Sequence, residues 1–170
     1  DYAYRSGLSG QNVTVAVMDT GIVAHPDFED RIIYFHDFCY GRKEMYDDNG
    51  HGTHVSGIIA AEAGNGGTLG VVSGGSTVDA NNLIDLVVID AFSKKTRDPR
   101  TGAWVANGTV YDVVYSLEYA RDIGCKVVNM SLGFDVYDEE LARYFEELCS
   151  ELTDNDDMPV SYTHLRAHET

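Results

Sequence analysis

Short apolar runs of strand length alternate in this sequence with longer segments whose apolar residues recur at helical spacing. The runs rich in β-branched residues, which we expect to form strands, are residues 13–18, 31–38, 84–92 and 126–130. Helices are expected at residues 51–63, after Thr109 and at residues 138–152. Strands that alternate with helices of this size form βαβ units. The sequence therefore predicts an α/β fold with a mostly parallel sheet covered by helices on both faces.

Local sequence also marks one helix start and two long connectors. Thr109 precedes Asp112 by three residues, which is the spacing of a helix capping box. Residues 64–82 are rich in Gly, Ser and Thr, and residues 93–108 mix charged residues with Pro and Gly. We expect both segments to be surface loops.

Polar residues lie where two of the expected strands end. Asp19 ends the first strand, Ser131-Leu132-Gly133 follows a later strand, and His51 opens a helix. In an open parallel sheet, sites form outside the carboxyl ends of the strands. We therefore expect these three segments to meet at one edge of the sheet.

Three motifs in this order resemble those of the subtilase family of serine peptidases. Residues 17–21 (Val-Met-Asp-Thr-Gly) resemble the family's aspartate motif, and residues 48–57, which contain His-Gly-Thr-His, resemble its histidine motif. Residues 128–133 are similar to its substrate-binding strand. The resemblance runs from about residue 7 to about residue 152. It implies a three-layer subtilisin-like fold and a serine-type endopeptidase that acts on polypeptides.

The resemblance also implies roles for individual residues. His51 would be the general base that takes a proton from a serine hydroxyl, since imidazole titrates near neutral pH. Asp19 would accept the other ring N–H of His51 and stabilise the imidazolium that forms. Ser131, Leu132 and Gly133 would pair with the backbone of an extended polypeptide substrate.

The last part of the sequence departs from the family pattern. The family continues with a strand, an oxyanion asparagine and a Gly-Thr-Ser helix that carries the nucleophile, but no serine here stands in that context. Residues 158–170 resemble a tail that recurs on unrelated sequences as translated adapter. We therefore expect residues 1–157 to be a partial subtilase catalytic domain, truncated on its C-terminal side, and residues 158–170 to be a non-native tail. Such a chain is expected to lack peptidase activity.

Other interpretations of these motifs remain open. A non-catalytic subtilase-like binding protein, or pseudoprotease, would also lack the serine. Asp-Thr-Gly occurs in aspartic proteases too, but their site needs a second copy that this sequence does not contain. His51 and His54 with a neighbouring aspartate have a weak metal-ligand spacing. Asp27 falls where subtilases often have a calcium ligand, yet residues 63–67 do not clearly supply partners, so no metal or other cofactor is predicted.

The charge balance argues against two classes of partner. Lys plus Arg is 12 and Asp plus Glu is 28, a net charge of −16 that disfavours nucleic acid and anionic membranes. No apolar run approaches the roughly 18 residues of a membrane span.

The sequence has three cysteines, an odd number, and they are widely spaced: Cys39, Cys125 and Cys149. No disulfide framework is therefore expected, and a cytoplasmic location is slightly favoured over a secreted one. No feature of the sequence indicates an oligomeric state.

Overall fold

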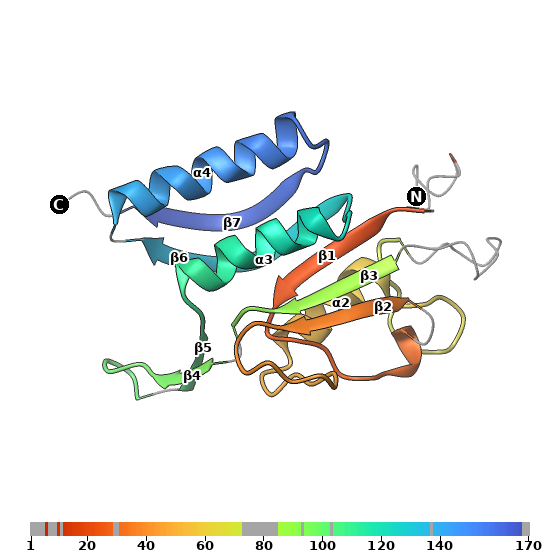
Figure 1. Ribbon diagram of the computed structural model, residues 1–170. Helices are drawn as coiled ribbons and strands as arrows, with labels where there is room; N and C mark the ends of the chain where they lie inside the picture. The colour runs from red at the N-terminus through yellow and green to blue at the C-terminus, as the bar shows by residue number, and fades with distance from the viewer. Residues whose placement is uncertain are drawn as a thin grey trace.

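Five parallel strands form the central sheet of the computed structural model, which describes residues 6, 10, 12–28, 31–72, 85–92, 94–102, 104–136 and 138–167. The order in the sheet is β2-β3-β1-β6-β7 (Figure 1), and all neighbouring pairs are parallel. The mostly parallel sheet predicted from the sequence is confirmed. The strands are β1 (Thr14–Asp19), β2 (Ile32–Asp37), β3 (Asp85–Asp90), β6 (Val127–Val136) and β7 (Val160–Ala167).

Helices cover both faces of the sheet, which gives the three layers predicted from the sequence. Side chains of β1 alternate between two apolar cores: Val15 and Val17 pack with α2, whereas Ala16 and Met18 pack with α3 and α4. All four side chains are at most 6% exposed, as expected for a parallel strand with helices on both sides. The helices are α2 (His51–Ala60), α3 (Val110–Asp122) and α4 (Glu139–Asp154), with a 3₁₀ turn η1 (Pro26–Phe28) beside α2.

The register of the sheet brings polar residues together at its carboxyl edge. Asp90 of β3 lies opposite Asp19 of β1 on one side and opposite Asp37 of β2 on the other. Strand β6 pairs with β1 only at Val127–Asn129 and then continues past the end of β1. The carboxyl edge is therefore level at β1, β2 and β3 and stepped at β6.

The helix starts follow local hydrogen bonding. Thr109 and Asp112 form both hydrogen bonds of the predicted capping box at the start of α3. Asp138 caps α4 by accepting from the backbone N–H groups of Glu140 and Leu141. Helix α2 begins after Gly50, which adopts a left-handed φ of 91°. This helix ends at residue 60, three residues before the predicted end.

The prediction of a surface loop over residues 93–108 is wrong in part. The segment contains an antiparallel hairpin of β4 (Lys94–Arg97) and β5 (Trp104–Asn107). Asp98 accepts hydrogen bonds from the N–H groups of Arg100 and Thr101, and Gly102 takes a left-handed φ of 71°, so the charged and Gly-containing stretch is the turn. Residues 64–72 are irregular as expected, and residues 73–82 lie outside the described part of the chain.

The last described residues join the sheet. Val160–Ala167 forms β7, which pairs with β6, and Met158 is 1% exposed in the core beneath α3 and α4. The assignment of residues 158–170 to a non-native tail, and of residues 1–157 to the domain, stays a prediction. The geometry adds that β7 and β2 are the two edge strands of the sheet.

The three cysteines are free thiols. Cys125 and Cys149 are buried in the core beneath α3 and α4. Burial raises the pKa of each thiol to about 11, so both are protonated at neutral pH. No described helix combines the length and apolar character that crossing a membrane would require.

We expect Leu117→Ala to lower the free energy of unfolding by about 2–5 kcal/mol, because Leu117 is fully buried where α3 packs on the sheet. Urea denaturation followed by circular dichroism would measure it. Tyr115→Ala is the matched control on the same helix, since Tyr115 is 56% exposed. Equal losses in the two variants would contradict the packing described here.

Candidate active site

The side chains of Asp19 and His51 are in direct contact at the carboxyl edge of the sheet. Asp19 ends β1 and is 2% exposed, whereas His51 is the first residue of α2 and its side chain is 49% exposed. Nδ1 of His51 lies 2.7 Å from Oδ1 of Asp19. With Asp19 ionised, Nδ1 carries the hydrogen and donates it, which leaves Nε2 as the ring nitrogen able to accept a proton.

Burial dominates the electrostatics of Asp19. Loss of solvent raises the pKa of this carboxyl above its ordinary value, against the hydrogen bonds from His51 and from the backbone N–H of Thr20, which lower it. Its second oxygen, Oδ2, has no hydrogen-bond partner among the described residues. A positive charge on His51 would therefore stabilise the buried carboxylate, and the carboxylate would stabilise the imidazolium in turn.

A second carboxylate, that of Asp47, ties the start of α2 to the end of β1. Its Oδ1 accepts from Thr20 Oγ1 at 2.9 Å, from the N–H of Gly50 at 2.7 Å and from the N–H of Asn49 at 3.1 Å. Its Oδ2 accepts from both the N–H and the hydroxyl of Thr53, at 2.9 and 2.7 Å. The carboxylate also lies at the positive end of the helix dipole. Asp47 thus fixes where His51 stands relative to Asp19.

Close backbone packing supports the same geometry. The N–H of Gly52 donates to Thr20 Oγ1 at 3.0 Å. A Cβ atom at position 52 would overlap the carbonyl oxygen of Gly21 and come within 3.1 Å of two backbone nitrogens. The first turn of α2 can therefore approach the chain after β1 only because residue 52 is glycine.

Asp19 and His51 line a pocket of about 250 Å³. Of the predicted substrate residues, Ser131 lines this pocket, Gly133 pairs with His164 of β7, and the side chain of Leu132 lies outside the described part. The pocket is lined by Asp19, Thr20, Asn49, His51, Phe92, Ala106 and Ser131.

Sequence reasoning missed several of these residues. Asp47 directly precedes the histidine motif of residues 48–57, and Asn49 lies within it. An aspartate shortly before a helix start could have suggested that Asp47 caps α2. Phe92 and Ala106 are apolar residues without a motif. Only the fold brings them to the pocket.

One group of potential metal ligands is present among the described residues, and hydrogen bonding explains its arrangement. Asp37, Cys39 and Asp90 offer ligand atoms within 4.8 Å of one another. Both oxygens of Asp37 already accept hydrogen bonds, which come from the N–H groups of Cys39, Tyr40 and Arg42 and from the hydroxyl of Tyr46. Although burial raises the pKa of Asp37, these bonds outweigh it and the pKa lies below its ordinary value. Asp37 therefore has a structural role, because its carboxylate accepts the N–H groups of the loop that follows β2.

The surroundings of Asp27 do not fit a calcium ion. Its carboxylate accepts from Asn65 Nδ2 at 2.7 Å and from the N–H of Thr68 at 3.2 Å. Calcium requires six to eight oxygen ligands, whereas nitrogen donors face this carboxylate. A Cβ atom at Gly67 would also overlap it. The loop after α2 is held to Asp27 by these hydrogen bonds.

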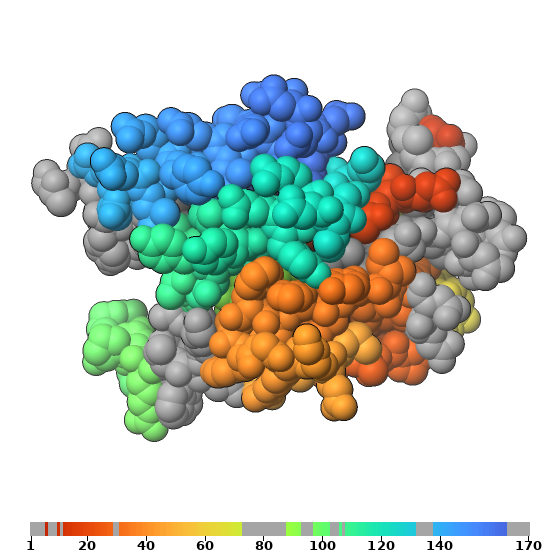
Figure 2. Space-filling view, viewed as in Figure 1, coloured from red at the N-terminus to blue at the C-terminus, as the bar shows by residue number. Residues whose placement is uncertain are grey.

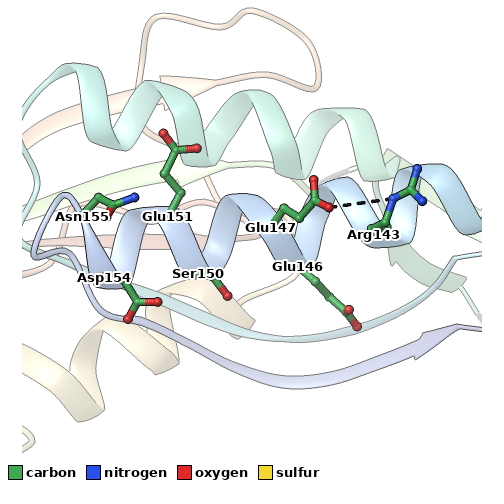
Figure 3. Close-up of a pocket in the computed structure, with 7 residues that line it drawn as sticks. All are labelled: Arg143, Glu146, Glu147, Ser150, Glu151, Asp154 and Asn155. Carbon is green, nitrogen blue, oxygen red and sulfur yellow. Dashed lines mark ion pairs between the residues drawn. The ribbon is translucent and has the colours of Figure 1, made fainter.

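A larger hollow lies on the outer surface of α4 and holds none of the predicted site residues (Figure 3). Arg143 and Glu147 form its ion pair, at 3.9 Å, and both side chains are mostly exposed. A solvated acidic helix face explains this surface. Its lining residues are Arg143, Glu146, Glu147, Ser150, Glu151, Asp154 and Asn155.

Comparison with known proteins agrees with this geometry. The model of the subtilase family (Peptidase_S8) matches residues 10–161. The serine protease AprX of Bacillus subtilis (strain 168) is 36% identical over 156 residues, which cover 84% of this chain and 31% of that protein. Subtilisin Savinase of Lederbergia lenta is 37% identical over 131 residues, which cover 77% of this chain and 41% of that protein. The chain thus spans less than half the length of these relatives.

Solved structures give the same result for the fold. Fervidolysin from Fervidobacterium pennivorans, described as a keratinolytic enzyme related to subtilisin, superposes with a TM-score of 0.63 at 26% identity. That match covers 100% of this chain and 23% of fervidolysin. MycP1 superposes with a TM-score of 0.64 at 18% identity, over 95% of this chain and 45% of MycP1, which supports the fold alone.

We expect Asp47→Asn to lower the free energy of unfolding by about 1–3 kcal/mol at pH 7, because an amide cannot satisfy five donors. Burial raises the pKa of Asp47, but its hydrogen bonds outweigh burial and hold the pKa below 3.8. Its contribution is therefore present above that value and lost as the pH falls through the lowered pKa. Urea denaturation at neutral and at acidic pH would show a smaller difference at acidic pH.

The control for this measurement is Asp156→Asn, an exposed carboxylate outside the network. It should change the free energy of unfolding by less than about 0.5 kcal/mol at either pH. A loss for Asp47→Asn no larger than that of the control would show that Asp47 does not hold the start of α2.

Proposed function

The chain belongs to the subtilase family, and from that premise we propose that it carries the Asp–His part of a serine endopeptidase, which hydrolyses peptide bonds with an Asp-His-Ser triad. The contact of 2.7 Å between His51 Nδ1 and Asp19 Oδ1 carries this proposal. A half-exposed imidazole held by a buried carboxylate is the arrangement that a general base requires.

The roles of the two residues follow from their surroundings. Nε2 of His51 takes the proton of the attacking serine hydroxyl and later gives it to the leaving amine. Asp19 keeps the hydrogen on Nδ1 and balances the charge of the imidazolium. Ser131 lines the same pocket, but its hydroxyl accepts from Asn129 Nδ2 at 2.9 Å and it belongs to β6. We assign it to substrate binding.

The substrates are polypeptides bound in extended form. Strand β6 continues past the end of β1, beside the pocket that holds His51. Backbone groups of Ser131, Leu132 and Gly133 lie on this continuation. A peptide added along it would place a scissile bond at the pocket, and pairing through the backbone makes recognition tolerant of sequence.

A non-catalytic subtilase-like binding protein is the second candidate. The observation in its favour is that the substrate groove, meaning the pocket at His51 together with the continuation of β6 beside it, is formed although no serine of the sequence follows Gly-Thr. Sequencing the source across the codon for Met158 separates the two candidates. A frame that continues to an asparagine and a Gly-Thr-Ser helix supports the peptidase, whereas a genuine stop after Thr170 supports the binding protein.

We expect the purified 170-residue chain not to cleave casein above the rate in buffer, since removal of the serine from a triad costs about a million-fold in turnover. Release of acid-soluble peptides would measure this. Cleavage that His51→Ala abolishes would show that the chain has a nucleophile of its own and would contradict the proposal.

We expect Asp19→Asn to change the tautomer of His51, because the amide can donate to Nδ1 and the hydrogen then moves to Nε2. The ¹⁵N chemical shifts of the two ring nitrogens would report the exchange. The exposed ring of His54, one turn later on α2, provides the internal reference and should not change. An unchanged tautomer at His51 would contradict the orienting role of Asp19.

A further inference from the structure

The β4–β5 hairpin leaves the sheet at the carboxyl end of β3 and protrudes from the body of the molecule (Figures 1 and 2). Its two ends meet closely at the base. A Cβ atom at Gly108 would overlap the carbonyl oxygen of Ala91 and come within 2.9 Å of the Phe92 ring. Phe92 and Ala106 line the pocket that contains His51. The base of the hairpin therefore forms one wall of the pocket, and β6, through Ser131, forms another.

The charge of the hairpin is opposite to that of the rest of the chain. Residues 94–107 hold four basic residues and one acidic residue, which gives +4 − 1 = +3. The remaining residues hold 12 − 4 = 8 basic and 28 − 1 = 27 acidic residues, a net charge of −19. Arg97 and Arg100 are exposed. A third of the chain's cations thus lies in one protrusion beside the pocket. The four basic residues are Lys94, Lys95, Arg97 and Arg100.

The register places Arg97, whose side chain is exposed, on the hairpin face that carries Ala106. Lys95 lies opposite Ala106, and Arg97 lies opposite Trp104. Directly opposed residues share a face of the ribbon, as do residues two apart on one strand. Positions 95 and 97 therefore share the face of Ala106, the residue that lines the pocket. Position 94 lies on the other face.

We propose that the β4–β5 hairpin is a specificity element, which selects polypeptides with acidic side chains in the part of the substrate that lies between the hairpin and β6. This inference rests on the proposed binding of extended polypeptides. A surface with a net charge of −16 repels acidic chains. A local group of cations at the groove removes this repulsion where the substrate enters and favours acidic over neutral or basic sequences.

The test compares three fluorescein-labelled peptides of equal length, identical except for a central pair of Glu, Gln or Lys, by fluorescence anisotropy with the intact chain. The Glu peptide should bind about fivefold to tenfold more tightly than the Gln peptide, as two exposed ion pairs would give. The Lys peptide should bind most weakly. The differences should vanish at about 1 M salt, where the Debye length is about 3 Å. Emission of Trp104, the single tryptophan, provides a second readout within the hairpin.

Double variants of Arg97 and Arg100, the hairpin cations whose exposed side chains are described, are compared with a control of the same change in net charge as the Glu variant. Arg97→Glu with Arg100→Glu should abolish or invert the preference for the Glu peptide, and Arg97→Gln with Arg100→Gln should abolish it with a smaller perturbation. Lys126→Glu with Arg143→Glu is the control. Lys126 precedes β6 at the opposite edge of the sheet, and Arg143 lies on the outer surface of α4 (Figure 3). The control should keep the preference.

Each contrary outcome has a distinct meaning. Equal binding of the three peptides would overturn the specificity proposal and leave polypeptide binding intact. An equal loss of preference in the hairpin variants and the control would assign the effect to net charge and would also overturn the proposal. If no peptide binds, the function proposed for the groove fails together with the inference that rests on it.

Discussion

The position of β1 in the middle of the sheet is the constraint on which the rest of the structure depends. Hydrogen-bonded to β3 and β6 and covered by helices on both faces, this strand must be apolar along its length. After the half-buried Thr14 at its start, its next polar side chain is Asp19, at the carboxyl end, where it is almost fully buried. An ionised carboxylate there needs donors. The chain supplies them from Thr20 and from His51 at the start of α2, so the hydrogen bonds that satisfy the buried end of the strand are also those of the site.

Asp47 and Asp19, the two aspartates that bond to the start of α2, differ in how fully their carboxylates are hydrogen-bonded. Asp47 has five donors, and its pKa lies below the ordinary value because they outweigh burial. Asp19 has two donors and a raised pKa, because burial prevails. A saturated carboxylate has little more to gain from a new positive charge, whereas an undersatisfied buried one has much to gain. Asp47 therefore acts as a structural clamp, and Asp19 remains available to respond to charge on the imidazole.

The parts of the structure that sequence could predict are those determined over short distances along the chain. The run of residues 13–18, the capping box at Thr109 and the motifs around Asp19 and His51 are local patterns, and the sheet, the helix start and the contact between the two side chains follow from them. The hairpin was missed because charged residues mask its strand pairing. Phe92 and Ala106 were missed because their place in the pocket depends on how the ends of β3 and β5 meet.

The pocket also has a part set by local sequence motifs, which we call its floor, and a part set by the meeting of distant segments, which we call its walls. The floor is held by hydrogen bonds among Asp19, Thr20, Asp47 and the first turn of α2, which leave little room for change. The walls come from the continuation of β6 and from the base of a hairpin that forms its own two-stranded sheet. Residues in the hairpin can change charge without disturbing the register of β1. The catalytic residues on the floor and the residues on the walls that select the substrate can therefore vary independently. The basic hairpin of this otherwise acidic chain lies where a change of charge disturbs the fold least.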